Sequence, residues 1–334
     1  MSSSSLISIL PPLKAESLQC IHRLQLHHRP NPIAIPKSRT ASVAIVLFVG
    51  RLGDLYVLLS TRAGDLRSYA SDTALPGGRY DPRDADEEET ARREAYEEIG
   101  LPMDREKVRF ICLLDQFLTG NALVVTPVVL LVTDNTISPI LNPSEVTHLF
   151  SMPLSAFLVH RPSLIPNWSL GISDRIHPLP PELVPPPPLV RYAEGAGQVG
   201  GKEGAYYAFR DVQWGEGTVR MHRFLTGREG RYLDGTTLLG DVGRENKRGE
   251  VTRSMSESES ESGSGNGGVG RVKPVYGLTS AILIHAAKIG CDRPPTFPIF
   301  APGQRNMSER IRWAMSHDPT LRKAIEQESS RAKL

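Results

Sequence analysis

Three glutamates stand close together in the first third of the chain. Glu94, Glu97 and Glu98 are spaced i, i+3 and i+4, so on a helix all three carboxylates share one face. Like charges at this spacing repel each other by about 0.2–0.5 kcal/mol per pair in an isolated helix. A divalent cation would offset that repulsion, and oxygen ligands on a rigid helix suit Mg²⁺ or Mn²⁺. The alternative is a solvated acidic face.

Two neighbouring features favour a bound ion. Arg93 directly precedes the glutamates and brings a positive charge to the same turn. Upstream lies Pro76-Gly77-Gly78, where a backbone without side chains can approach a ligand or offer a carbonyl oxygen to a metal. Together these residues predict a metal site rather than a plain acidic surface.

A short helix is expected to carry the three carboxylates. Asp86 and Glu89 have the spacing of a capping box, and Gly100 followed by Pro102 provides a stop. The same helix has an apolar face that can dock on a core, formed by Ala91, Ala95 and Ile99.

The stretch from Gly78 to Leu101 resembles the Nudix box, whose general form is G-x5-E-x7-R-E-U-x-E-E-x-G-U, with U an aliphatic residue. Its second half, which begins at Arg93, matches at every fixed position. The first half departs, because Asp84 stands where the glutamate is expected and lies one residue too far from Arg93. Asp84 and Glu87 are therefore both candidates for the first acid of the box.

The residues upstream of the box resemble an additional motif of coenzyme A diphosphatases, roughly L-L-x-x-R-S-x-x-L-R-x-H-x-G-x-x-x-F-P-G-G. The matching stretches are 58–62, 66–67 and 75–78, and the spacing of Asp81 and Asp84 after the glycines is also typical of that subfamily. Four positions differ from the motif, with Ala63 for Ser, Tyr69 for His, Ser71 for Gly and Leu75 for Phe.

This resemblance implies metal-dependent hydrolysis of the diphosphate bond of coenzyme A, or of its acyl or oxidised derivatives. The products would be adenosine 3′,5′-bisphosphate and a 4′-phosphopantetheine. The implied metal ligands for Mg²⁺ or Mn²⁺ are Glu94, Glu97, Glu98 and the Gly78 carbonyl. A divalent ion neutralises the anionic diphosphate and lowers the pKa of bound water.

The remaining site residues follow from the same resemblance. Arg93 pairs with an upstream acid and braces the loop against the helix, and Glu94 is a candidate general base. Glu145, in a loop, is a second candidate for the base. Arginines form bidentate hydrogen bonds with phosphates, and the substrate-binding candidates are Arg62, Arg67 and Arg79.

Two other functions stay open. One is a Nudix hydrolase for another nucleoside diphosphate, such as NADH, an oxidised nucleotide or an RNA cap. The other is a non-catalytic binding module with the same fold. The intact glutamate triplet argues against the module, and the upstream arginines favour coenzyme A as substrate.

Strands and helices are expected in an order that fits an α/β fold, the α/β/α sandwich of the Nudix family with a mixed β-sheet. Pro127 predicts an edge strand or a bulge at 123–132. Strands are expected at 42–50, 54–61, 108–114, 123–132, 143–150, 205–210 and 218–224, and helices at 14–28, 153–158 and within 274–290.

A single Nudix domain is expected over residues 41–303. An N-terminal extension, 1–40, precedes it, and a helical tail, 304–334, follows it. In the Pro/Gly-rich stretch 162–204 the pattern of strands and helices is lost, and the Gly/Ser/Glu-rich stretch 227–271 is too poor in apolar residues to order itself. We therefore predict that both are disordered insertions within the domain.

The net charge, the cysteines and the apolar runs of the chain limit the partners and compartments that fit it. The chain has 39 lysines and arginines against 37 aspartates and glutamates, a net charge of +2, which makes nucleic acid an improbable partner. Cys20, Cys112 and Cys291 are widely spaced, which indicates neither a disulfide framework nor a zinc site. No apolar run reaches the length of a membrane span.

The last three residues resemble a targeting signal. Ala332-Lys333-Leu334 resembles the S-K-L type of peroxisomal import signal, which predicts a peroxisomal import receptor as partner. The basic N-terminal region offers a mitochondrial alternative, and a cytoplasmic protein is the third possibility.

Overall fold

The computed structural model describes most of the chain. The described residues are 10, 12–29, 32–50, 52–66, 69–134, 136–161, 189–190, 199–200, 206–225 and 274–331. The two predicted insertions, apart from the short strands at 189–190 and 199–200, lie outside the described residues. Arg67 and Ala332-Lys333-Leu334 also lie outside them.

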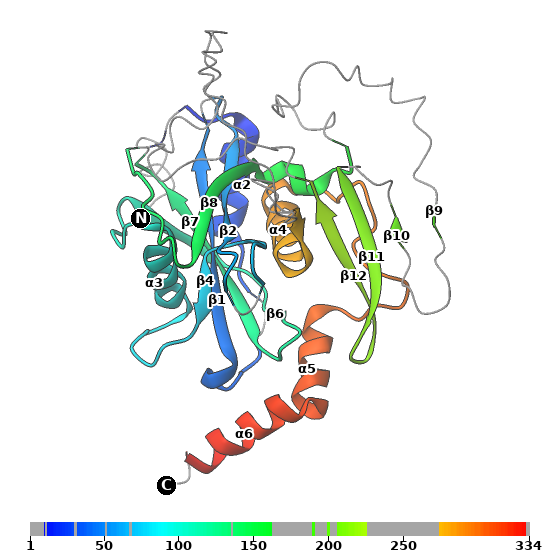
Figure 1. Ribbon diagram of the computed structural model, residues 1–334. Helices are drawn as coiled ribbons and strands as arrows, with labels where there is room; N and C mark the ends of the chain where they lie inside the picture. The colour runs from blue at the N-terminus through cyan, green and yellow to red at the C-terminus, as the bar shows by residue number, and fades with distance from the viewer. Residues whose placement is uncertain are drawn as a thin grey trace, which may run out of the picture.

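A mixed eight-stranded sheet forms the centre of the molecule (Figure 1). Its main path runs β3-β2-β1-β7-β5, with β4 beside β1, β6 beside β7 and β8 beside β2. β1 and β7 are parallel, and the other pairs in this sheet are antiparallel. The strands are β1 (Thr40–Val49), β2 (Leu55–Arg62), β3 (Thr73–Ala74), β4 (Gly77–Arg79), β5 (Val108–Leu113), β6 (Phe117–Leu118), β7 (Val124–Val132) and β8 (Val146–Pro153).

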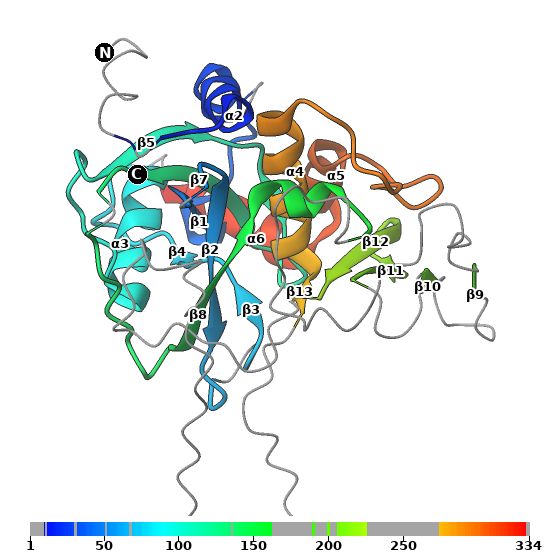
Figure 2. The same ribbon diagram turned by 90° about the horizontal axis from the view of Figure 1, so that it is seen from above.

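Helices cover both faces of this sheet, as the predicted α/β/α sandwich requires. Helix α3 (Glu87–Ile99) lies on one side, and α2 (Ala15–Leu26) and α4 (Gly277–Cys291) lie on the other (Figure 2). Alternate side chains of a strand point to opposite faces. In β1, Ala44, Val46 and Phe48 therefore pack with α3, whereas Ile45, Leu47 and Val49 pack with α2 and α4.

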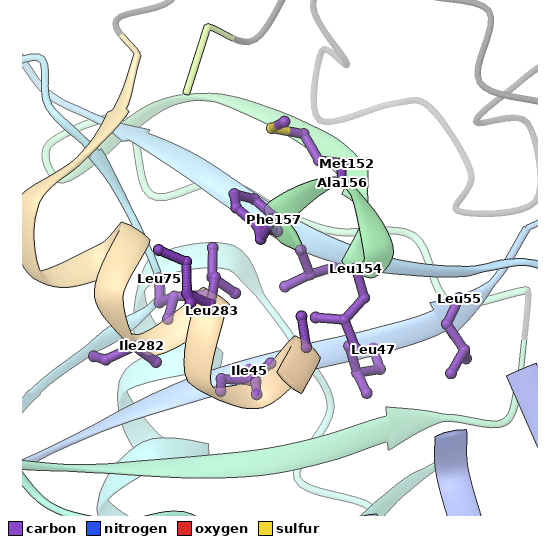
Figure 3. Packing of buried hydrophobic residues seen from close by; sticks show 14 of the residues in the cluster. Ile45, Leu47, Leu55, Leu75, Met152, Leu154, Ala156, Phe157, Ile282 and Leu283 are labelled. Atoms are coloured by element: carbon purple, nitrogen blue, oxygen red, sulfur yellow. The ribbon is translucent and has the colours of Figure 1, made fainter. Parts of the chain in front are cut away.

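The core on the α4 side is built from large apolar side chains. Ile282 and Leu283 of α4 lie over Ile45 and Leu47 of β1 (Figure 3). All four are at most 1% exposed, and full burial of such a side chain stabilises the fold by about 1.5–3 kcal/mol. A short 3₁₀ helix, η2 (Leu154–Leu158), closes this core at the end of β8.

A second, antiparallel sheet lies on the far side of α4. The strands predicted at 205–210 and 218–224 belong to it, but the sequence analysis did not predict that they form a sheet of their own. Its order is β13-β12-β11-β10-β9. Tyr207 and Phe224 of this sheet belong to the same buried cluster as Ile45, so α4 joins the two sheets through one core. The strands are β9 (Leu189–Val190), β10 (Val199–Gly200), β11 (Tyr207–Trp214), β12 (Gly217–Phe224) and β13 (Val275–Tyr276).

Two helices end the described chain. Helix α5 (Met307–His317) begins with a capping box between Asn306 and Glu309. Helix α6 (Pro319–Arg331) lies below the sheets in the view of Figure 1, and its Glu328 accepts a hydrogen bond from the Lys37 N–H at 3.3 Å. Their buried residues, Ile311, Ala314 and Leu321, pack against β6 and the start of β7. Within the described residues, no helix is both long and apolar enough to cross a membrane.

Of the two alternatives predicted from Pro127, an edge strand or a bulge, the edge strand is wrong. β7 is an interior strand, with β1 on one side and β5 and β6 on the other. The Pro127 carbonyl accepts a hydrogen bond from the Leu114 N–H at 2.9 Å. Since the N–H and C=O of one residue point to the same side of a strand, the missing N–H faces the break between β5 and β6. An interior strand tolerates proline there because its partner strand is interrupted.

Candidate active site

Helix α3 starts and stops where its sequence signals predict. The Asp86 carboxylate accepts a hydrogen bond from the Glu89 N–H at 2.9 Å. The return bond differs from a closed capping box, because Glu89 Oε2 accepts from the Ala85 N–H at 2.7 Å, one residue before the cap. Gly100 ends the helix in a left-handed conformation, with φ of 65°.

Arg93 is the centre of the hydrogen-bond network at this helix. Its guanidinium donates from Nε and Nη2 to the two carboxylate oxygens of Asp84, at 2.9 and 3.0 Å. Nη2 also donates to the Arg79 carbonyl at 3.0 Å, while Nη1 contacts Glu94 at 3.0 Å and Glu97 at 3.2 Å. A bidentate pair of this kind fixes both position and orientation, so Arg93 braces the loop against the helix.

The geometry favours Asp84 over Glu87 as the first acid of the box. Burial opposes the ionisation of Asp84, but hydrogen bonds from the Arg93 guanidinium and the Asp81 N–H lower its pKa overall. Glu87 lies elsewhere, with its carboxylate 3.3 Å from Nη2 of Arg29. The extra residue between Asp84 and Arg93 does not prevent the ion pair.

The two glycines of β4 permit a close approach that no other residue allows. A Cβ atom on Gly77 would lie 2.4 Å from the Ser42 carbonyl oxygen in β1. A Cβ atom on Gly78 would lie 2.3 Å from Oε1 of Glu94. The backbone of Gly78 therefore lies directly against a carboxylate of α3.

The three glutamates differ strongly in exposure. The Glu98 side chain is 4% exposed, against 16% for Glu94 and 49% for Glu97. The face is thus graded from a buried acid to a half-exposed one, and it is not the uniformly solvated surface of the alternative interpretation.

Burial controls the electrostatics of the inner acids. It raises the pKa of Glu98 to about 8, although Nη1 of Arg62 lies 3.7 Å from the carboxylate and the Gly77 N–H hydrogen-bonds to it. Burial also raises the pKa of Glu94, against the effect of the Arg93 guanidinium. The negative charge of Glu145 raises the pKa values of both acids further.

Glu145 reaches this cluster through strand pairing. β8 runs antiparallel to β2, with Val146 opposite Arg62, and the Glu145 carbonyl accepts from the Ala63 N–H at 2.8 Å. Sequence reasoning placed Glu145 in a loop without this neighbour. Only the pairing of two distant strands sets it beside α3, and no local motif encodes that.

The donor set fits a hard divalent cation. Its groups are carboxylates and the backbone of Gly78, which lies beside Glu94. One of the carboxylates, the buried Glu98, has too little countercharge to stay ionised at neutral pH. Among the described residues, no three acidic, histidine or cysteine side chains converge on one point in this structure. Arg93 instead contacts both Glu94 and Glu97.

The three arginines predicted to bind substrate do not all lie at the acidic cluster. Arg62 lies at the acidic cluster, and its buried Nε has no hydrogen-bond partner among the residues that the structure describes. Arg79 is exposed at the end of β4, with its carbonyl bound to Arg93. Arg67 lies outside the described residues.

Comparison with known proteins identifies relatives of this region. Residues 38–167 match the family model described as the NUDIX domain. Nudix hydrolase 15, mitochondrial, of Arabidopsis thaliana is 42% identical over 123 residues, which cover 36% of this chain and 42% of the relative. Peroxisomal coenzyme A diphosphatase 1 of Saccharomyces cerevisiae is 36% identical over 150 residues, which cover 37% and 44%.

A bacterial relative is matched over more of its own length. Uncharacterized Nudix hydrolase NudL of Pectobacterium atrosepticum is 36% identical over 154 residues, which cover 46% of this chain and 77% of the relative. The plant and yeast relatives are matched over less than half of their own lengths.

Proposed function

This chain belongs to the Nudix hydrolase family, and from that premise we propose that it hydrolyses the diphosphate bond of coenzyme A or of its acyl or oxidised derivatives. The products would be adenosine 3′,5′-bisphosphate and an (acyl-)4′-phosphopantetheine. The observation that supports the chemistry most strongly is the bidentate Arg93–Asp84 pair beside a graded set of three glutamates.

The proposed metal is Mg²⁺ or Mn²⁺, held by Glu94, Glu97, Glu98 and the Gly78 carbonyl. When bound, such an ion supplies charge neutralisation at the diphosphate and a lowered pKa for bound water. Arg93 holds Asp84, Glu94 and Glu97 in fixed relation, so the loop and the helix meet the substrate as one unit.

Two residues are candidates for the general base. Glu94 has a pKa raised by burial, and a carboxylate with a raised pKa accepts a proton from water more readily near neutral pH. Glu145 is the alternative, since it lies in the same electrostatic cluster. Glu145→Gln distinguishes them, because Glu94 is also a proposed metal ligand and its replacement would lower the rate in either case. A large fall in the single-turnover rate of Glu145→Gln at saturating Mg²⁺ would assign the base to Glu145, and a rate near that of the wild type would leave Glu94.

The substrate assignment draws on Arg62 and on the yeast relative. The buried Nε of Arg62, which has no hydrogen-bond partner among the described residues, could donate to a phosphate oxygen, and the yeast relative is a coenzyme A diphosphatase. We propose that Arg62, Arg67 and Arg79 bind the phosphates of the substrate.

A parallel assay tests the substrate. Purified protein with Mg²⁺ or Mn²⁺ is offered coenzyme A, dephospho-coenzyme A, NADH and 8-oxo-dGTP. We expect the highest kcat/KM for coenzyme A and a lower value without the 3′-phosphate. Faster turnover of NADH or 8-oxo-dGTP would show that the substrate is another nucleoside diphosphate. Binding of coenzyme A without hydrolysis of any of the four compounds would indicate a non-catalytic binding module.

We also propose a peroxisomal location through recognition of Ala332-Lys333-Leu334 by an import receptor. The yeast relative is named as peroxisomal. The Arabidopsis relative is named as mitochondrial, which keeps the mitochondrion as the alternative address.

A further inference from the structure

Helices α2 and α4 contact each other at a pair of cysteines. Cys20 lies on α2 and is buried, while Cys291 is the last residue of α4 and is partly exposed. Each thiol shifts the pKa of the other, so the two side chains are neighbours. A Cβ atom on Gly290 would lie 2.4 Å from Sγ of Cys20, so the absence of a side chain at Gly290 is what admits the sulfur to this position.

Arg23 holds the two helices together beside the thiols. Its Nη1 donates to the Gly290 carbonyl at 3.3 Å, and its Nε lies 3.6 Å from the carboxylate of Asp292. Arg23 therefore contacts the residue before Cys291 and the residue after it. Such anchoring keeps the two sulfurs in proximity, which is the geometric requirement for a bond between them.

The environments of the two thiols give them different reactivity. A hydrogen bond from Cys20 lowers the pKa of Cys291, and the charges of Arg293 and Arg23 lower it further against the effect of burial. The same hydrogen bond and burial raise the pKa of Cys20. Since the thiolate is the nucleophile in thiol–disulfide exchange, Cys291 is the attacking residue and Cys20 the resolving one.

We propose that Cys20 and Cys291 are a modification site that exchanges with low-molecular-weight disulfides such as glutathione disulfide and becomes an intramolecular disulfide. The Cys291 thiolate attacks one sulfur of the small disulfide, whose S–S bond breaks and releases one thiolate. Cys20 then loses its proton and attacks Sγ of Cys291, which expels the second small thiol. The protein gives up two electrons, and the small disulfide is reduced to two thiols.

The bond would link parts of the chain that are distant in sequence. It ties α2, near the N-terminus, to the end of the helix that joins both sheets. Closure of such a long loop restricts the unfolded chain strongly. We therefore expect the oxidised protein to melt about 5 °C or more above the reduced protein.

Full-length protein equilibrated with glutathione buffers of increasing oxidised fraction tests the proposal. Free thiols should fall from three to one, and peptide mapping should find Cys20 joined to Cys291 within one chain. Cys112, whose pKa is raised to about 12 by burial, should remain a thiol. The matched variant Cys112→Ser should oxidise like the wild type, whereas Cys291→Ser should not form the bridge.

The mapping of the wild type decides the question even if a cysteine variant folds poorly. Three free thiols at the most oxidising buffer would overturn the proposal. A bridge that includes Cys112, or one found only between two chains, would overturn it as well.

Discussion

At the scale of single residues, the positive charge near each acid decides whether its carboxyl group is ionised at neutral pH. Asp84 has two hydrogen bonds from Arg93 and a lowered pKa, whereas the buried Glu98, despite Arg62 at 3.7 Å and the Gly77 N–H, has a pKa raised to about 8. Asp84 is thus held ionised by Arg93, whereas Glu98 lacks a countercharge that a bound cation would supply.

This difference predicts separate effects on activity and stability in Glu98→Gln. Glutamine resembles the protonated acid, so the fold should persist while hydrolysis falls by about a hundredfold or more, as for loss of a metal-activating contact. Activity with Mg²⁺ and unfolding in urea are the measurements. Glu87→Gln, at the start of the same helix, is the matched control and should keep nearly full activity.

The pH dependence supplies a second measurement on the same pair of proteins. The pKa of Glu98 is higher in the folded than in the unfolded state, so ionisation favours unfolding. With a chelator present, the stability of the wild type should fall relative to Glu98→Gln as the pH rises from about 5 to 8. Equal activity of Glu98→Gln and wild type would remove Glu98 from the site.

At the scale of elements, the loop between β2 and β3 contains a residue in an unfavourable backbone conformation. Ser71 has φ of 58°, and the related motif has glycine at this position. Glycine adopts this conformation without the Cβ penalty. We expect Ser71→Gly to raise the free energy of unfolding by up to about 1 kcal/mol, after the greater freedom of the unfolded chain is subtracted.

Ser71→Ala provides the control, because alanine keeps the backbone penalty and loses only the hydroxyl. Its stability in urea should not exceed that of the wild type. A less stable Ser71→Gly protein would mean that the loop does not hold the left-handed conformation in solution.

The second sheet contains a histidine that is held neutral. The Ile299 carbonyl can only accept, so Nε2 of His222 donates to it at 3.0 Å, and Nδ1 accepts from the Tyr207 hydroxyl at 3.0 Å. Burial lowers the pKa of His222 to about 4. The unfolded chain therefore binds a proton below pH of about 6.5 while the folded chain does not, and stability is lost as the pH falls from about 6.5 to 4.

His222→Gln should remove this loss, which amounts to about 3 kcal/mol by pH 4. Urea unfolding at several pH values checks it, with the exposed His22→Gln as control. A wild type and a His222→Gln variant with parallel pH profiles would contradict the assignment.

Local patterns predicted the elements well and their neighbours poorly. The cap at Asp86, the stop at Gly100 and the shared face of the glutamates depend on residues a few positions apart, and the structure has each of them. The partner of Arg62, the approach of Glu145 and the place of β7 depend on pairings between distant strands. Spacing along the chain carries no information about such pairings, and the wide spacing of Cys20 and Cys291 likewise did not predict that α2 and α4 bring them together.

At the scale of the whole molecule, the two ends of the second proposed insertion are held next to each other. β12 and β13 pair through Phe224 with Val275 and Arg223 with Tyr276. The intervening chain therefore has to connect neighbouring points only. This supports the proposal that residues 41–303 form a single domain with insertions rather than two linked domains.

Deletion of residues 240–270 should leave the melting temperature and the hydrolysis rate nearly unchanged, because the cost of loop closure varies slowly with length. Thermal unfolding followed by circular dichroism, together with the coenzyme A assay, makes the test. A variant that fails to fold would show that this segment contributes to the core.

The peroxisomal address is tested in cells. A fluorescent protein fused to the N-terminus leaves Leu334 free, and we expect it to label peroxisomes because Ala332-Lys333-Leu334 resembles the S-K-L type of import signal. Removal of Ala332-Lys333-Leu334 should disperse the label. Labelling that survives the truncation would assign import to another signal, and diffuse label of the intact fusion would reject the address.

The position of α4 between the sheets has a consequence for protein synthesis. The ribosome completes β1 long before it makes Gly277–Cys291, and until then the Ile45 and Leu47 face of the sheet lacks its cover. At ordinary rates of translation this interval is on the order of tens of seconds. The nascent chain therefore exposes an apolar sheet face during this interval, and the sheet is covered by α4 only after Cys291 has been made.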